Sequence, residues 1–196
     1  MRTEVRLTVV GVLVYGGKMA KVFYRRRLPH WHPAGKALFV TWRLYGSLPA
    51  GRAFPGNEGF EAFDRLLDGM SSGPLYLRMP EIAEIVAGEI LRLEGILVSA
   101  WVIMPNHVHL LAKADDCADW VRVLKLIKGR SARAANLVLG RTGQPFWQEE
   151  SFDRWLRDED EFAKVRRYIE RNPVTSGLAG SPEQFRWSSA WREPQL

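Results

Sequence analysis

The spacing of apolar residues along the chain predicts four strands and four helices. Residues 37–44 are largely apolar at both alternating sets of positions, which is typical of a central strand buried on both faces. Residues 96–104 form a second apolar run, and a proline-asparagine turn separates it from a third strand over 107–113. The aromatic-rich residues 146–156 predict a fourth strand.

A helical period of about 3.6 residues recurs in four further segments. We expect these helices over residues 58–67, 80–95, 118–139 and 158–172. Pro80 opens the second helix, because proline is favoured in the first turn. Asp158 and Glu161 form a capping box at the start of the last helix, and Pro173 is expected to end it. Two prolines within residues 28–35 predict a loop or extended arm.

The order of these elements indicates an α+β fold with a ferredoxin-like β-α-β-β-α-β core. Its sheet is expected to be antiparallel, with extra helices and a C-terminal helix. We expect residues 36–180 to form the main domain, residues 19–35 a basic N-terminal arm and residues 181–196 a tail packed on the domain. Because this architecture supports many functions, the fold alone does not identify the activity.

Composition and charge limit the class of protein. With 196 residues, of which 46% are hydrophobic, the chain is long enough for a single packed domain. Its 28 Lys and Arg residues against 22 Asp and Glu residues give a net charge of +6, which suits a polyanionic partner. The single Cys117 excludes an internal disulfide and is typical of a protein in a reducing cytoplasm.

The N-terminal segment contains an apolar stretch, Val5 to Tyr15, that is too short to span a bilayer. A run of three arginines follows, without the small-residue cleavage site of a signal peptide. We therefore expect no membrane role. The sequence from Met19, MAKVFYRRR, is more typical of the start of a protein. We therefore interpret residues 1–18 as an upstream extension of the reading frame.

Two histidines at the start of the third strand are the first candidates for chemistry. His107 and His109 are two positions apart, so both imidazoles emerge on one side of the strand. Two neighbouring imidazoles can supply two ligands of a metal site, although an isolated pair of this kind more often fills hydrogen-bonded positions in a sheet. A second pair, His30 and His32, lies in the proline-rich arm and is more typical of a loop.

The last two predicted helices carry further candidates. Tyr168 and Asn172 lie four residues apart, so both project from one edge of the last helix. By spacing alone, Tyr168 is more typical of a packing residue than of a catalytic one, and four other tyrosines are available. The helix over 118–139 has a basic face, which is typical of solvated surface or of a surface along a phosphate backbone.

Five ordered motifs are more specific than any single histidine pair. They are YRRRLPHWHPAGKALFVTWRLYGSLP, VIMPNHVHLL, FWQEESFDRWLRDEDEF, RRYIERNPVTSGL and FRWSSAW. In these motifs the chain resembles the REP-associated tyrosine transposases, a branch of the single-tyrosine transposases within the HUH endonucleases. The resemblance covers nearly everything from Phe23 onward and agrees with the ferredoxin-like fold.

The resemblance implies roles for four residues. His107 and His109 are implied to be catalytic and to bind a divalent cation, Mg²⁺ or Mn²⁺, and Tyr168 is implied to be the nucleophile. A third, polar ligand is implied one turn after the tyrosine, at Asn172, where related insertion-sequence enzymes carry a glutamine. Asparagine is shorter than glutamine by one methylene group.

The implied activity is metal-dependent nicking and strand transfer of single-stranded DNA, through a 5′-phosphotyrosine intermediate, at hairpins of palindromic repeats. The candidate residues for holding the DNA are Arg25, Arg26, Arg27, Lys128, Arg130 and Arg133. Two alternatives stay open: a non-catalytic module of the same fold that binds single-stranded nucleic acid, and a metal-dependent hydrolase that uses water. The sequence is compatible with a monomer or a homodimer.

Overall fold

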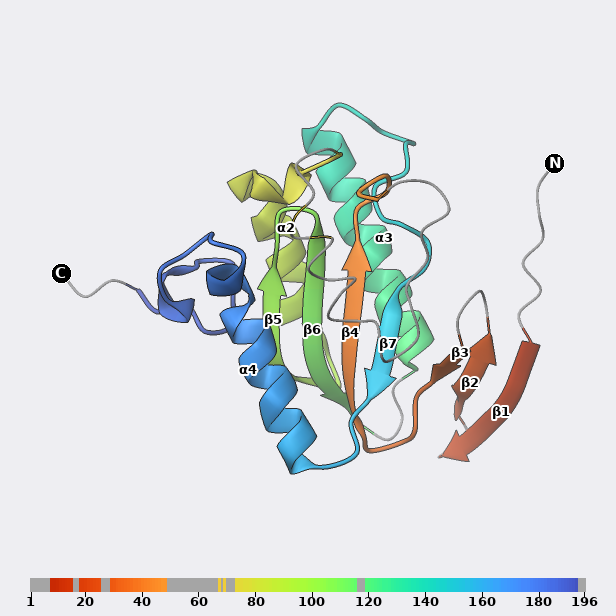
Figure 1. The fold of residues 1–196 in the computed structure, drawn as a ribbon. Coiled ribbons are helices and arrows are strands. Elements are labelled where there is room, and N and C mark those ends of the chain that lie inside the picture. The colour runs from red at the N-terminus through yellow and green to blue at the C-terminus, as the bar shows by residue number, and fades with distance from the viewer. Residues whose placement is uncertain are drawn as a thin grey trace.

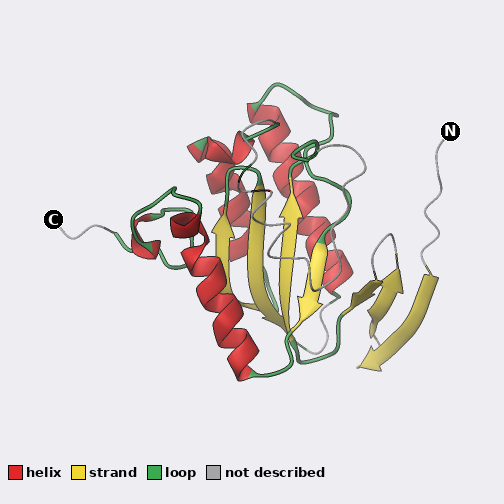
Figure 2. Cartoon of the chain, in the orientation of Figure 1, coloured by secondary structure: helices red, strands yellow, loops and turns green. Residues whose placement is uncertain are grey.

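The computed structural model describes most of the chain (Figures 1 and 2). The described residues are 8–15, 18–25, 29–48, 67, 69, 73–115 and 119–193, and over residues 8–31 the description is of the backbone alone. The predicted helix over 58–67 therefore lies outside the described residues, apart from Leu67, which is helical. Arg26 and Arg27 lie outside them as well.

Four antiparallel strands form the main sheet, in the spatial order β5-β6-β4-β7. They are β4 (Ala37–Arg43), β5 (Ile96–Ile103), β6 (His107–Ala114) and β7 (Phe152–Trp155). This is the ferredoxin-like arrangement, in which the first and third strands of the β-α-β-β-α-β unit are central. The predicted fold class, the central position of residues 37–44 and the hairpin over 96–113 are therefore confirmed.

Two helices cover one face of the sheet and a third covers the other (Figure 1). The first face carries α2 (Pro80–Leu91) and α3 (Trp120–Val138), and the second carries α4 (Glu159–Thr175). Pro80 opens α2 as predicted, and a 3₁₀ helix, η2 (Tyr76–Arg78), leads into it. The Asp119 carboxylate caps α3 by accepting the N–H of Val121 at 2.9 Å.

Each face of the sheet has its own apolar core. Val40 and Trp42 point toward α2 and α3, whereas Phe39 lies on the α4 side together with Ile169. This division follows from the alternation of side chains along β4. No helix among the described residues is long and apolar enough to cross a bilayer.

The fourth predicted strand is wrong in its first half. Residues 146–151, which precede β7, form no ladder with β4. Their pairing with the end of β4 is limited to an isolated bridge between Leu44 and Trp147. The Trp147 indole N–H donates instead to the hydroxyl of Ser131 on α3, at 2.9 Å. This segment is therefore held partly by a helix, which its aromatic composition alone does not reveal.

Helix α4 continues past the predicted end at Pro173. Proline is tolerated there because its missing N–H interrupts the helix only in the last turn. The helix ends two residues later in a Schellman motif: Leu178 N–H donates to Pro173 O at 2.8 Å, and Gly177 N–H to Val174 O at 3.1 Å. Gly177 has a φ of +69°, the left-handed conformation that this motif requires.

The predicted capping box at the start of α4 is half confirmed. The Asp158 carboxylate accepts the N–H of Glu161 at 2.8 Å. The Glu161 carboxylate, however, accepts from the N–H of Arg157 rather than from that of Asp158, at 2.8 Å. It also pairs with Arg154 of β7 at 2.7 Å, so this glutamate joins the first turn of α4 to the sheet.

A second, smaller sheet precedes the main one. It consists of β1 (Thr8–Tyr15), β2 (Lys18–Arg25) and β3 (Pro29–Trp31), all antiparallel. The predicted arm over 28–35 thus contains a short edge strand, which its prolines argued against. Pro29 is the first residue of that edge strand, a position where proline is tolerated. The interpretation of residues 1–18 as an upstream extension stays a prediction.

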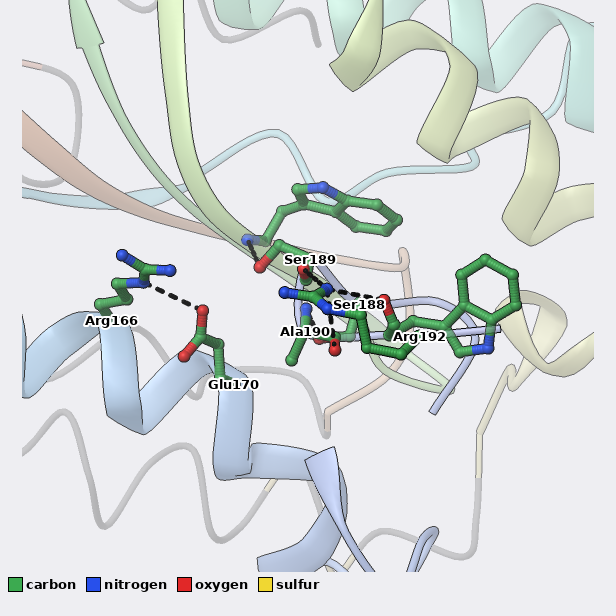
Figure 3. Close-up of polar contacts among 8 residues, drawn as sticks. Arg166, Glu170, Ser188, Ser189, Ala190 and Arg192 are labelled. Carbon is green, nitrogen blue, oxygen red and sulfur yellow. Dashed lines mark hydrogen bonds and ion pairs between the residues drawn. The ribbon is translucent and has the colours of Figure 1, made fainter. Parts of the chain in front are cut away.

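The C-terminal segment 181–193 lies along the β5 edge of the main sheet, after a 3₁₀ turn, η3 (Pro182–Gln184). Ile103 N–H donates to Trp187 O at 2.8 Å. The Arg192 guanidinium donates to three backbone carbonyls of this segment, the shortest contact being 2.8 Å (Figure 3). These bonds satisfy part of an otherwise open sheet edge.

Candidate functional site

Two histidines begin β6 at the end of the sheet where β4 finishes. His107 lies directly opposite Arg43, and His109 lies opposite Thr41. Both imidazoles are fully buried on the α4 side of the sheet. Their Nε2 atoms are 3.1 Å apart, so the rings emerge side by side, as the alternation of a strand requires.

Asn106 fixes the position of the proton on His107. The Asn106 amide nitrogen donates to the Leu67 carbonyl at 2.9 Å, which leaves its Oδ1 facing His107 Nδ1 at 2.6 Å. Because an amide oxygen only accepts, the neutral His107 ring carries its hydrogen on Nδ1. The lone pair of Nε2 therefore faces His109. Such outer hydrogen bonds orient metal-binding histidines.

Thr41 and Phe39 hold the second imidazole. The Thr41 hydroxyl lies 2.7 Å from His109 Nδ1, and the Phe39 ring stacks on the imidazole at 5.6 Å. A hydroxyl can donate or accept, so His109 can carry its proton on either nitrogen. When the proton is on Nε2, His109 donates a hydrogen bond to His107. When the proton is on Nδ1, the Nε2 lone pairs of both histidines can bind one shared cation.

Helix α4 brings two further residues to the imidazoles. Asn172 is 3% exposed, and its amide nitrogen lies 3.4 Å from His109 Nε2. The Tyr168 ring, one turn earlier, lies edge-on to His109 at 5.8 Å and to Phe39 at 6.2 Å. The four residues expected at the site from the sequence are thus brought together within one chain.

The donor atoms suit a single divalent cation. Two nitrogens bound at right angles and about 2.1 Å from an ion are about 3.0 Å apart, close to the 3.1 Å between the two Nε2 atoms. Asn172 offers an amide oxygen when its side-chain amide is turned over. Within the described part of the chain, no three His, Cys, Asp or Glu side chains cluster. The two imidazoles and the amide are neutral ligands, so they would not reduce the positive charge of a bound ion.

Comparison with known proteins identifies the family of this domain. Residues 78–172, just under half of the chain, match the family described as transposase IS200 like. The matched segment contains both histidines of the pair, Tyr168 and Asn172. The chain carries an IS200-like transposase domain. It is accordingly an enzyme that acts on DNA. No curated protein sequence matches the chain.

One solved structure shares the architecture of this transposase. A REP-associated tyrosine transposase bound to a REP hairpin is 16% identical, with a TM-score of 0.55 over 84% of this chain and 82% of its own. A protein of Deinococcus radiodurans assigned as a transposase is 17% identical, with a TM-score of 0.36 over 69% and 88%. The first match shows a common fold, and the second TM-score is too low to add to it.

The predicted DNA-holding residues of α3 lie away from the histidines of this transposase. Helix α3 packs on the sheet face opposite to α4 (Figure 1), and Arg130 and Arg133 are exposed. The Lys128 ammonium donates to two backbone carbonyls of the segment before β7, at 2.8 Å each, so it has a structural role. Arg25 ends β2, and its side chain is outside the description. DNA binding by these residues stays a prediction.

One histidine of the second pair, His32, has a structural contact. His32 Nε2 lies 2.8 Å from the Asp153 carboxylate of β7, and both side chains are buried. This contact ties the segment before β4 to the edge strand. His30 lies in β3, where only the backbone is described. The contact gives His32 a structural role, whereas His30 belongs to the short strand β3 rather than to the predicted loop.

Three residues at the site were not expected from the sequence: Thr41, Arg43 and Asn106. A signal was present for two of them, because Thr41 and Arg43 are polar residues on one face of an otherwise apolar central strand. Arg43 is only 6% exposed, and desolvation by burial lowers its pKa. Arginine is almost never buried without a partner, so Arg43 is an unusual residue for this face of the sheet.

Proposed function

We propose that this transposase cleaves and rejoins single-stranded DNA through a covalent 5′-phosphotyrosine on Tyr168. The observation that carries the proposal is the 5.8 Å ring distance between Tyr168 and His109, whose Nε2 lies 3.1 Å from that of His107. A nucleophile beside a pair of metal-binding side chains is what in-line phosphoryl transfer requires.

His107, His109 and Asn172 would hold the cation. Mg²⁺ or Mn²⁺ bound there would act as a Lewis acid on the phosphodiester and orient it for attack. The two imidazoles favour Mn²⁺, because Mg²⁺ prefers an all-oxygen octahedron. Asn106 and Thr41 keep the two rings in their orientations by bonding the opposite ring nitrogens, at 2.6 and 2.7 Å.

The proposed step exchanges one ester bond for another. The Tyr168 phenol oxygen bonds to phosphorus while the bond from phosphorus to the 3′ oxygen breaks. The phenol proton is lost and the leaving 3′ oxygen takes up a proton, so the step is balanced without a nucleotide cofactor. Because the phosphoryl group stays activated on the tyrosine, the 3′-hydroxyl of another strand can reverse the reaction and create a new junction.

We propose hairpins of palindromic repeats as the substrate. The support is the resemblance in five motifs, together with a common fold with a transposase that was solved with a REP hairpin. The net charge of +6 suits a nucleic acid. Since both imidazoles are fully buried, the phosphate can reach them only when part of the cover over the site moves.

A single chain supplies the histidines, the tyrosine and the asparagine, which supports catalysis by a monomer. The alternative, a binding module without catalysis, has less support. Ferredoxin-like domains that bind single strands present an open sheet face. Here α4 covers that face, with Tyr168 in contact with Phe39 and His109.

A covalent-adduct assay tests the proposal. Wild type, Tyr168→Phe and Tyr45→Phe are incubated with Mn²⁺ and end-labelled single-stranded DNA that carries a palindromic hairpin from the host genome. Denaturing gels then separate protein-linked DNA. Tyr45 is a control tyrosine because its side chain is 55% exposed, whereas the site histidines are fully buried. We expect an adduct with wild type and Tyr45→Phe, none with Tyr168→Phe, and loss of the adduct in EDTA.

Other outcomes distinguish the alternatives. An adduct that persists in Tyr168→Phe moves the nucleophile to another residue. DNA binding without cleavage in every metal supports the binding module, and cleaved DNA without attached protein supports a hydrolase that uses water.

A further inference from the structure

A buried arginine, Arg43, lies beside the histidine pair, and no described residue is its acidic partner. Arg43, the last residue of β4, is 6% exposed. Its Nη1 donates to the Ser47 hydroxyl at 3.2 Å, and its Nε has no hydrogen-bond partner. In the described part of the chain, no carboxylate lies within ion-pair distance of Arg43.

The strand register directs Arg43 to the site. Arg43 lies opposite His107 on β6, two positions along from the pair formed by Thr41 and His109. The 2.7 Å contact between Thr41 and His109 shows which face these side chains occupy. Side chains two residues apart on a strand share a face, so Arg43 lies on the same face as both imidazoles.

Burial of this charge is costly without a counter-ion. Desolvation lowers the pKa of Arg43, and no opposing effect of a nearby anion accompanies it. Buried charges in proteins are normally paired. A guanidinium fork matches two oxygens of a phosphate especially well. An anion that arrives with the substrate would compensate the charge only in the complex.

We infer that Arg43 binds the non-bridging oxygens of the DNA phosphodiester that lies at the histidine pair. The inference rests on the proposed function for the identity of the anion. It assigns to β4 a phosphate-binding residue, separate from the basic residues of the N-terminal arm and of α3. It also explains why an arginine occupies a buried position at the end of a central strand.

The first test measures thermal unfolding without DNA. Arg43→Met keeps an unbranched chain and removes the charge, so its midpoint is expected about 2–5 °C above that of wild type. Arg154→Met is the matched control, because Arg154 lies on the neighbouring β7 and is paired with Glu161 at 2.7 Å. Its midpoint is expected at or below that of wild type.

The second test adds the hairpin DNA in a Tyr168→Phe background, in which the proposed covalent step cannot occur. DNA is expected to raise the midpoint of the background protein and of Arg154→Met. The rise is expected to be lost in Arg43→Met and partly retained in Arg43→Lys, which keeps the charge without the fork. In proteins that retain Tyr168, Arg43→Met is expected to slow adduct formation about 100-fold or more.

The two unfolding experiments decide the inference independently of catalysis. A midpoint of DNA-free Arg43→Met at or below that of wild type would show that Arg43 is structural and overturn the inference. An undiminished DNA-dependent rise in Arg43→Met would overturn it as well. If wild type forms no adduct in any metal, the proposed cleavage fails, yet the DNA-dependent midpoints still test Arg43.

Discussion

The proposed metal site is tested most strongly by changing a residue that would not touch the metal. Asn106 is 2% exposed, and its side chain bonds the Leu67 carbonyl at 2.9 Å and His107 Nδ1 at 2.6 Å. Asn106→Ala removes both bonds and frees the His107 ring to rotate and to change tautomer. Loss of such an outer partner typically weakens metal binding about 10–100-fold, which corresponds to roughly 1.4–2.8 kcal/mol.

The stability cost must be separated from the effect on the metal. Leaving buried polar groups without partners costs about 1–3 kcal/mol in the free energy of unfolding. Asn136→Ala is the matched control, because Asn136 is 5% exposed and donates to the Gln144 carbonyl at 2.7 Å, away from the site. Both variants should lose stability, and only Asn106→Ala should lose affinity for Mn²⁺.

Calorimetric titration with Mn²⁺ measures this difference directly, and thermal unfolding verifies that each variant is folded. Asn106→Asp provides a second comparison, because its carboxylate still accepts from His107 but cannot donate to Leu67. We expect it to lose stability and to keep or increase its Mn²⁺ affinity. Equal Mn²⁺ affinities of Asn106→Ala and Asn136→Ala would refute the argument that Asn106 positions a metal ligand.

Two further changes test the site and its support. Asn172→Gln lengthens the amide by one methylene group, so its oxygen can extend further toward a bound ion. We expect Mn²⁺ affinity in calorimetry equal to or higher than that of wild type, and a clear loss would contradict the argument that the longer amide reaches the ion better. Asp153→Ala leaves buried His32 without the carboxylate at 2.8 Å, so the free energy of unfolding in urea should fall by about 1–3 kcal/mol. Its adduct formation should persist when the protein is folded, and an unchanged stability would contradict the structural role of His32.

Strand alternation was sufficient to predict the common direction of the two histidines. His107 and His109 follow a proline-asparagine turn and belong to an apolar run, so their shared face depends only on local geometry. The helix that packs over that face could not be predicted in the same way. Tyr168 reaches His109 through the packing of α4 on the sheet, a contact between residues 59 positions apart that no local pattern encodes.

The basic residues illustrate the opposite case. The period of α3 predicted a polar face that includes Arg130 and Arg133, and both residues are exposed. Their distance from the site depends on which side of the sheet the helix packs, and helical periodicity contains no such information. Lys128 was assigned to DNA for its charge, whereas its ammonium bonds two backbone carbonyls. Charge alone does not distinguish a capping lysine from a phosphate-binding one.

The described site is formed by neutral donors and one cation. Asn106, His107, His109 and Asn172 contribute no negative charge, and Arg43 adds a positive one. A site with carboxylate ligands would repel a phosphodiester until an ion arrived, whereas this one attracts an anion from the start. The phosphate would then serve two groups at once, as the counter-ion of a buried guanidinium and as the substrate for Tyr168. On this view, the stability sacrificed by burying Arg43 is recovered only when DNA is correctly placed, which couples positioning of the phosphate to formation of the reactive arrangement.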